Sequence, residues 1–501
     1  MRLHSTAAVI FLTGPLLFPA QAFAEVTAAD VWEDWLALSE SYGQTIEVGE
    51  ERYRGGVLSL SGVTTQANLP DGEMSGTLGE IVLTEGADGS VTVTLPAEYP
   101  LTMRSQDEGT GDEVEMAMVV RQSGLDLVAT GESGAIEYSF SAPSVSVSID
   151  DFVAGGETVE MSLVATLSDT TGSYGAAASA DGALESLLEA ASLGIVLSLE
   201  DPAEGVSVDM TVSMTDIANR STGTISPFAA GAELSQMLRQ GFASEGRMTT
   251  GGTTFEIAVD NGETPVEITG RSDGGDLDFS VGEDGILYSG ENRGLAATLA
   301  VTSMPLPPFT FEIAEAGGEV RMPLIETEEN QEFGLKLNLA GLALGDTIWS
   351  MFDPMGGLPR DPADLSLDLS GQGRWSVDIT DPDAMADLES SGAMPGEVDA
   401  ISLNRLALSF LGAELTGAGD FAFSDGPVAP VPAGLVNLRL TGGNAAIDSL
   451  VAAGLLPEEQ AMGVRMMLNL FAQPGSGADE LTTTLEFKDD GSVLANGQRI
   501  R

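Results

Sequence analysis

The chain has 501 residues, of which 77 are acidic and 20 are basic, so its formal net charge is −57. Only two lysines occur, Lys336 and Lys488, and this acid excess excludes binding to a nucleic acid backbone and disfavours anionic lipid surfaces. Cysteine is absent, and the single histidine is His4. The sequence therefore predicts no disulfide, and beyond His4 it offers no imidazole for a catalytic pair or a metal site.

The N-terminal residues have the pattern of a secretory signal peptide. Arg2 supplies a positive charge, Ala7 to Phe18 form an apolar stretch, and Ala22-Phe23-Ala24 matches a cleavage site. We therefore expect residues 1–24 to be removed and the mature protein to lie in the periplasm or, alternatively, outside the cell. No later segment has the length and apolar character of a membrane-spanning helix, so we expect no transmembrane segment after cleavage.

A helix is predicted from Ala28 to Tyr42, because Val31, Trp35, Leu38 and Tyr42 recur at steps of three and four residues. From about residue 46 the apolar period changes to two, which predicts strands with one apolar and one polar face. Turn signals such as Asn261-Gly262 separate these strands and favour antiparallel hairpins. The clearest alternating runs cover residues 91–95, 114–120, 136–140, 159–167, 206–214, 335–339 and 481–487.

A few helices are expected to interrupt the strands as caps. They are predicted at Glu185–Leu193, Phe228–Phe242, Asp346–Phe352 and Ala445–Phe471, the last divided at Gly454 and restarted at Pro457. The predicted fold is therefore mainly β: a long, twisted antiparallel sheet or a sandwich, with an N-terminal helix and a few capping helices. Residues 25–501 are expected to form one elongated domain, with a lobe boundary near residues 302–308, where prolines cluster.

A sheet with one apolar face must cover that face with a second sheet, with helices, or with a ligand. A closed sandwich is one prediction, and an open sheet whose apolar face forms a groove is the other. If the sheet forms a groove, two strands supply the ligand-binding face. The candidate residues are Leu406, Leu408, Phe410, Val436, Leu438 and Leu440.

Motifs for enzymatic chemistry are missing from the sequence. No phosphate-binding loop, dinucleotide fingerprint or nucleophile elbow occurs, so we expect no cofactor and no catalytic residue. A hydrolase that uses two carboxylates stays open, because acidic residues are abundant. Asp273, Asp276 and Asp278 are the best local candidates for calcium, but their spacing fits no calcium motif and is more typical of a solvated turn, so no metal site is predicted.

Three stretches of the C-terminal half resemble two known families. Trp349-Ser350-Met351-Phe352-Asp353-Pro354 with Leu358-Pro359-Arg360-Asp361-Pro362, and the closing residues 463–501, resemble the alphaproteobacterial family named domain of unknown function 2125, over most of the mature chain. The family implies no activity and no catalytic residue. Residues 406–419 are similar to the strand-turn-strand texture of AsmA-like envelope proteins, a resemblance that implies an apolar groove for lipids.

These observations predict an exported, non-enzymatic envelope protein that binds a lipid or another hydrophobic ligand in an apolar groove of its sheet. An envelope protein is the other expected partner. The alternatives are an interaction or structural module with a closed sandwich core, and a carboxylate-dependent hydrolase.

Overall fold

The computed structural model describes residues 26–41, 43–69, 72–106, 113–176, 183–201, 205–224, 234–303, 306–392, 394–424 and 431–501. The predicted signal peptide, Tyr42 and the first residues of the predicted helix Phe228–Phe242 lie outside these ranges.

Six helices and 27 strands are formed by the described residues. The helices are α1 (Ala28–Ser41), α2 (Leu234–Arg239), α3 (Asp346–Phe352), α4 (Pro382–Ser391), α5 (Gly443–Ala452) and α6 (Glu458–Phe471). The strands are β1 (Gln44–Glu47), β2 (Glu50–Arg54), β3 (Val57–Leu69), β4 (Gly72–Glu85), β5 (Val91–Thr94), β6 (Glu98–Gln106), β7 (Glu113–Ser123), β8 (Asp126–Glu132), β9 (Ala135–Ala154), β10 (Glu157–Ala176), β11 (Ala183–Asp201), β12 (Val206–Thr224), β13 (Ser244–Thr250), β14 (Thr253–Asp260), β15 (Val266–Ser272), β16 (Gly274–Gly282), β17 (Gly285–Val301), β18 (Phe309–Met322), β19 (Gln331–Leu344), β20 (Ala363–Trp375), β21 (Gly396–Phe410), β22 (Ala413–Ser424), β23 (Val431–Thr441), β24 (Gln473–Pro474), β25 (Glu480–Phe487), β26 (Val493–Ala495) and β27 (Gln498–Arg499).

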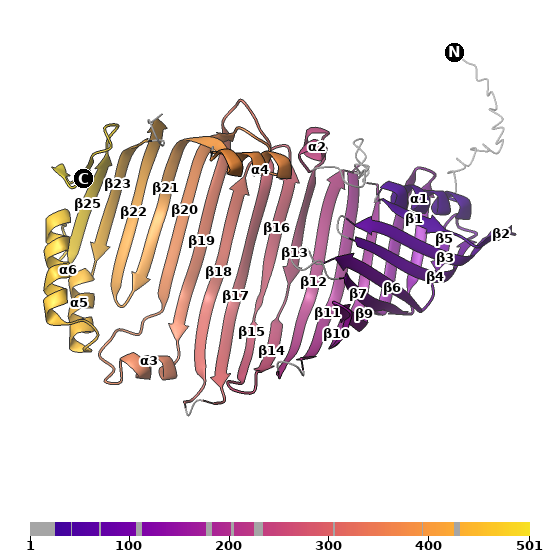
Figure 1. The fold of residues 1–501 in the computed structure, drawn as a ribbon, viewed down its shortest axis with the longest axis horizontal. Helices are drawn as coiled ribbons and strands as arrows, with labels where there is room; N and C mark the ends of the chain where they lie inside the picture. The colour runs from indigo at the N-terminus through magenta and orange to yellow at the C-terminus, as the bar shows by residue number, and fades with distance from the viewer. Residues whose placement is uncertain are drawn as a thin grey trace, which may run out of the picture.

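All the strands belong to one antiparallel sheet, which runs as a meander along the length of the molecule (Figure 1). From β9 to β12 and from β17 to β23, each strand pairs with the strand that follows it in the chain. Where two short strands replace one long strand, they lie end to end: β13 and β14 both pair with β12, and β15 and β16 both pair with β17. Of the two predicted architectures, the long single sheet is the one observed.

The helices lie at the ends and edges of this sheet. Helix α1 covers the first strands, α5 and α6 lie beside β25, α2 and α4 lie at one edge, and α3 lies at the opposite edge (Figure 1). The predictions of an N-terminal helix, of helix Asp346–Phe352 and of two helices meeting near Gly454 are confirmed. The sheet continues across residues 302–308, because β17 pairs with β18.

The prediction of a helix at Glu185–Leu193 is wrong, because these residues lie in β11. The sequence Glu-Ser-Leu-Leu-Glu-Ala-Ala has a high intrinsic helix propensity, since Leu, Glu and Ala are strong helix formers. In the fold, however, β11 is a central strand that pairs over nearly its whole length with β10 and with β12. Two complete ladders of hydrogen bonds outweigh a local preference of a few tenths of a kcal/mol per residue, about the size of helix propensity differences.

Helix α4 was not predicted, although the sequence contains its signal. The side chain of Asp381 accepts a hydrogen bond from the backbone N–H of Ala384 at 3.1 Å, as an N-cap residue does. Pro382 follows as the first helical residue, where its missing N–H costs nothing.

A line of bends crosses the sheet along its length. Asp169, Asp216, Gly294 and Gly341 have positive φ angles between 47° and 70°, and each lies where the pairing of its strand is interrupted. Gly124, which also has a positive φ, lies between β7 and β8. Glycine, and less readily aspartate, tolerates this left-handed conformation. The interruptions lie opposite one another on successive strands, so the bends add up to a fold line across the sheet.

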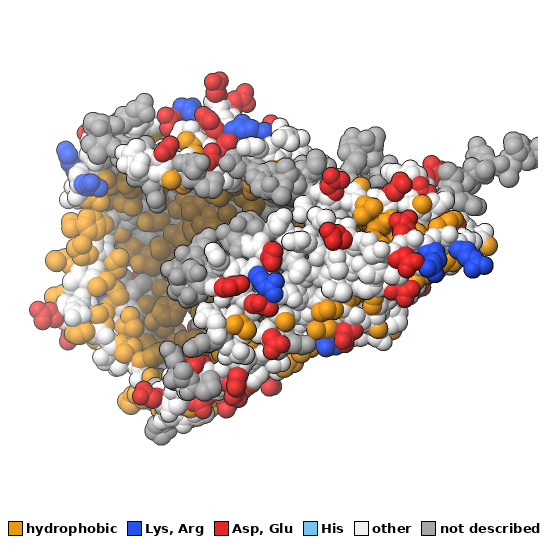
Figure 2. Space-filling view, turned by 45° about the vertical axis from the view of Figure 1, so that its right-hand side comes forward, with side chains coloured by type: hydrophobic (Ala, Val, Ile, Leu, Met, Phe, Trp, Pro, Cys, Tyr) orange, Lys and Arg blue, Asp and Glu red, His pale blue; other side chains and the backbone are white. Residues whose placement is uncertain are grey.

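The apolar side chains lie on the inner side of this fold line. On β10 the apolar positions are odd-numbered before the bend, as at Leu163, and even-numbered after it, as at Tyr174, which is expected when one residue is inserted into the alternation. Ala142, Thr170 and Ala190, next to the bend, are only 2–4% exposed. The sheet is therefore curved into a trough, and Figure 2 shows a hollow lined mainly by hydrophobic side chains.

Candidate functional site

One continuous line of paired residues follows the trough from β3 to β25. We call it the central row, and all its members face the same side of the sheet because directly paired residues do so. At roughly 4.8 Å between neighbouring strands, it extends for about 80 Å. It consists of Leu58, Leu83, Val93, Leu127, Phe140, Gly172, Leu188, Asn219, Met248, Leu277, Gly290, Gly318, Leu337, Leu367, Leu406, Gly417, Leu438 and Thr483.

Two further rows flank the central row on the same face. The second row consists of Ala129, Tyr138, Tyr174, Ser186, Ser221, Gly246, Phe279, Tyr288, Val320, Leu335, Leu369, Leu403, Gly419, Val436, Leu485 and Ala495. The third row, near the C-terminal end of the sheet, consists entirely of leucine: Leu339, Leu365, Leu408, Leu415, Leu440 and Leu481.

The structure places the six predicted site residues on this one face. Leu406 and Leu438 belong to the central row, Leu408 and Leu440 to the third row, and Val436 to the second row. Phe410 lies at the end of β21, two residues beyond Leu408 on the same face, and pairs with Ala413. The two predicted strands are not neighbours, because β22 lies between them, and their leucines meet across Gly417.

Glycines limit how far the neighbouring side chains project from the sheet into the trough. At four positions a phenyl ring lies over a glycine of the next strand, so closely that a Cβ on the glycine would be 2.2–2.4 Å from a ring carbon. A ring in this position lies along the sheet instead of projecting into the trough, as in the rescue of a strand glycine by an aromatic neighbour. The four pairs are Phe140 with Gly172, Phe255 with Gly270, Phe279 with Gly246, and Phe333 with Gly371.

The central row is covered at one end and open at the other. Leu58, Leu83 and Val93 are at most 2% exposed, because they belong to the core that α1 closes with Val31 and Trp32. Farther along, Leu337 of the central row is 42% exposed, and Tyr288 and Val320 of the second row are 50% and 43% exposed. Leu408 and Phe410 of the predicted site are 40% and 51% exposed. The apolar face is thus closed over the first strands and accessible between β17 and β21.

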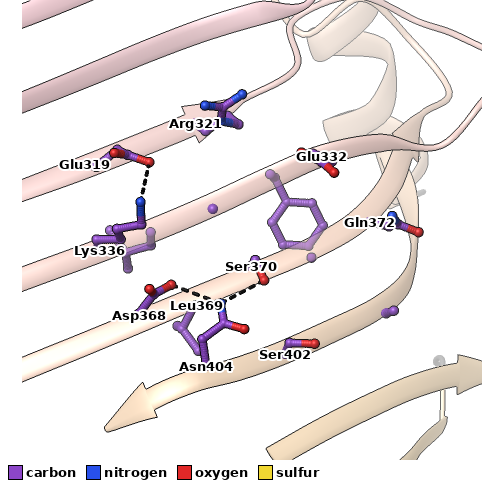
Figure 3. A pocket seen from close by; sticks show the side chains of 15 residues that line it. Glu319, Arg321, Glu332, Lys336, Asp368, Leu369, Ser370, Gln372, Ser402 and Asn404 are labelled. Atoms are coloured by element: carbon purple, nitrogen blue, oxygen red, sulfur yellow. Dashed lines mark hydrogen bonds and ion pairs between the residues drawn. The ribbon is translucent and has the colours of Figure 1, made fainter. Parts of the chain in front are cut away.

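The opposite face of the sheet is polar and carries shallow pockets. One pocket, of about 510 Å³, lies over β18–β21 (Figure 3). Several of its polar groups bond to one another: Lys336 donates to Glu319 at 3.0 Å, and the amide of Asn404 donates to Asp368 at 3.0 Å and to Ser370 at 2.9 Å. Because these groups bond to one another, the pocket is a shallow depression in a solvated polar surface.

The three aspartates considered for calcium also lie outside the trough. Asp276 and Asp278 approach Arg247, and Asp276 approaches Arg293 at 3.2 Å. Asp273 lies 3.3 Å from Arg271. Among the described residues, no cluster of three or more histidine, cysteine or acidic side chains could hold a metal ion.

The loop after α3 contains the sequence Asp353-Pro354, and its structure explains why these residues stand together. Asp353 is buried and accepts hydrogen bonds from the backbone N–H groups of Leu358 at 3.0 Å and Gly357 at 2.8 Å. These bonds hold the pKa of Asp353 below its usual value. Arg360 stacks over Trp349 at 5.6 Å, so the loop is fastened to the edge of the sheet.

Sequence reasoning found one end of the trough and missed the rest. Leu335, Leu337 and Leu339 were recognised as a strand but not as part of the site, because the sequence does not state which strands pair. A signal was present, since the leucines of β19 and β20 alternate with the same spacing, as do Leu406 and Leu408 of β21.

Comparison with known proteins adds a family to this description. Residues 294–500 match the model of a family described as an uncharacterized protein conserved in bacteria, DUF2125. The matched segment, from β17 to the C-terminus, is shorter than the mature chain that the resemblance was expected to cover.

No curated protein and no solved structure matches the chain. No described helix has the length and apolar character needed to cross a membrane. The similarity of residues 406–419 to AsmA-like envelope proteins stays a prediction. The resemblance drawn from the C-terminal half is confirmed by this match, and residues 294–500 of the chain are similar to the DUF2125 family.

Proposed function

We propose that the protein is an exported, non-enzymatic envelope protein that binds the hydrocarbon chain of a lipid in the trough. The single observation that carries this proposal is the open part of the apolar face, where Tyr288, Val320, Leu337 and Leu408 are each at least 40% exposed. A contiguous exposed apolar surface in a soluble protein is typical of a binding site.

The shape of the surface favours a chain over a compact ligand. The three rows run in parallel along the trough and keep the same apolar character from strand to strand. A long, flexible hydrocarbon chain can follow such a surface and remove apolar area from water along its whole length. A compact ligand would contact only a few strands and leave the remaining leucines exposed.

The charge of the chain supports a role in an aqueous compartment. Acidic side chains lie on the outer surface, whereas the hollow is lined by hydrophobic ones (Figure 2). A net charge of −57 keeps such a molecule soluble while one face stays apolar. The predicted signal peptide places that compartment outside the cytoplasm, and the periplasm is the location we propose.

A structural module is the second candidate. A β-rich sheet from an uncharacterised family is consistent with a non-enzymatic structural role, in which a partner protein would cover the open rows. For the third candidate, a hydrolase, the signature would be two buried carboxylates facing a polar cleft. Asp353 is the one buried acidic side chain in the described part of the chain, and backbone N–H groups hold it.

The proposal is tested by native mass spectrometry with lipid extraction on the mature protein from the periplasm of its own host. We expect stoichiometric phospholipid or fatty acid, and uptake of added lipid by delipidated protein. Leu337→Glu and Leu408→Glu should each reduce uptake at least about tenfold, because each places a charge against a hydrocarbon chain.

The matched control is Val196→Glu. Val196 is 52% exposed, but it lies on the outer face of β11, so this variant should bind lipid as the wild type does. A wild-type protein that carries no lipid and takes up none would overturn the proposal and would favour the structural module.

A further inference from the structure

A strip of uncharged polar side chains interrupts the apolar face on β10–β12. Tyr174, Ser186 and Ser221 are consecutive members of the second row, and Asn219 is the neighbouring member of the central row. Apart from Thr483 at its far end, Asn219 is the only polar side chain of the central row. The strip lies where the core under α1 ends and the open part of the trough begins.

Three of the four side chains of this strip lack hydrogen-bond partners within the described chain. Neither the hydroxyls of Ser186 and Ser221 nor the amide of Asn219 has a hydrogen bond to another described residue, although all three side chains are half-buried. On the same face of β10, Thr170 is 2% exposed and its Oγ1 has no partner.

Buried polar groups in native proteins are nearly always hydrogen-bonded, because leaving one unpaired costs free energy. Thr170 is the buried group of this face to which that rule applies. Ser186, Asn219 and Ser221 are partly exposed to the trough, so the polar group of a ligand lying there can reach them and supply the bonds that the protein does not. All of them are neutral donors and acceptors. Asp34 of α1, which covers the first strands, already accepts a hydrogen bond from the Tyr138 hydroxyl at 2.7 Å. Arg220 lies between Asn219 and Ser221 in sequence and so faces the opposite side of the sheet.

We infer that Ser186, Asn219 and Ser221 bind the neutral polar group of an amphiphile whose hydrocarbon chain lies along the central row from Met248 towards Leu337. The polar group carries hydroxyl or ester oxygens, as in a glyceride or a glycosyl lipid. A phosphate or carboxylate would meet no cation on this face and would be repelled by the acidic chain. The inference rests on the proposed function and adds the class of lipid and its orientation.

The test compares two probes on the mature full-length protein: monoolein, which has a neutral hydroxyl headgroup, and hexadecane, which has none. Binding is measured by displacement of Nile red. We expect the double variant Asn219→Leu/Ser221→Ala to bind monoolein about tenfold more weakly, since it loses two or three hydrogen bonds. Its affinity for hexadecane should be unchanged or higher, because leucine makes the central row continuously apolar.

Ser213→Ala is the matched control, because Ser213 lies on the outer face of β12 and should affect neither probe. An unchanged affinity of the double variant for monoolein would overturn the inference and leave the proposed function standing, and so would an equal loss for both probes, which indicates damage to the fold. A wild-type protein that binds neither probe would overturn the proposed function itself, and the inference with it.

Discussion

Glycine shapes the trough at the scale of single residues. Gly172, Gly246, Gly270 and Gly371 are each covered by a phenyl ring, whereas Gly417 lets two leucines close over it. In an ordinary strand a glycine weakens the sheet, because it is flexible and has no side chain to pack. Here the missing side chain provides the space that large apolar neighbours occupy, so hydrophobic area is kept without filling the trough.

The first prediction concerns Gly270→Ala. The new Cβ would lie 2.2 Å from a ring carbon of Phe255, so the ring must leave its position and project into the trough. We expect the free energy of unfolding to fall by about 1–3 kcal/mol, as in overpacked cores. Urea unfolding followed by circular dichroism measures the change.

Gly194→Ala is the matched control, since a Cβ on Gly194 has nothing within 4 Å. It should be neutral or stabilising by up to about 1 kcal/mol, because alanine restricts the unfolded chain. Equal effects of the two substitutions would contradict the role assigned to the rings.

At the scale of elements, α3 and its loop show how one carboxylate can fix a segment. Asp353 receives the backbone N–H groups of Leu358 and Gly357, while Trp349, Leu358 and Leu411 form a small core between this loop and the turn of β21–β22. The residues 349–362 that suggested the family by sequence are therefore explained by local structure, and none of them lies in the three rows of the trough.

The second prediction is that the protection of this loop from hydrogen exchange depends on pH. The pKa of Asp353 is lowered in the folded state, so its stabilising effect is complete at neutral pH and is lost as the pH falls through the folded-state pKa. Hydrogen exchange of residues 345–362, corrected for its intrinsic pH dependence, should show protection that disappears at acid pH.

Asp353→Asn should weaken this protection at pH 7 and remove the acid transition, because an amide has no charge to lose. Asp361→Asn, at an exposed position of the same loop, should behave as the wild type. An acid transition that persists in Asp353→Asn would show that another group controls the loop.

The whole molecule is a single curved sheet that carries a large excess of negative charge. Its apolar face is covered by α1 at one end and exposed over the later strands, so stability is concentrated in the core of the first strands. Repulsion among 77 acidic side chains opposes the folded state, and only 20 basic side chains offset it.

The third prediction follows from this repulsion. Raising the NaCl concentration from about 0.01 M to about 0.5 M shortens the screening length from about 30 Å to less than 8 Å. We expect the midpoint of thermal unfolding to rise by several degrees, because like charges repel one another less. Sodium fluoride should act equally if the effect is screening, and a midpoint that falls with either salt would contradict the prediction.

Much of this fold could be predicted from the sequence, because a strand with one buried face shows alternating apolar and polar residues along its own sequence. Val206 to Met214 and Leu481 to Phe487 are strands for that reason. Helix Glu185–Leu193 was predicted wrongly, since intrinsic propensity acts within a few residues whereas the ladders of β11 join it to separate strands. The sequence identified only β21 and β23, which are close together in the chain, as strands of the candidate site.

The sequence by itself determined the alternation of apolar and polar residues, the acidic excess, the absence of cysteine and the similarity of residues 294–500 to a family, since each of these depends only on the order and composition of the residues. Only the tertiary structure decided that the sheet bends along a line through Asp169 and Asp216, that one row joins Leu58 to Leu438, and that Asn219 interrupts it. Those features depend on which strands pair and in which register, and pairing is set by the global burial of apolar area rather than by any local stretch of chain.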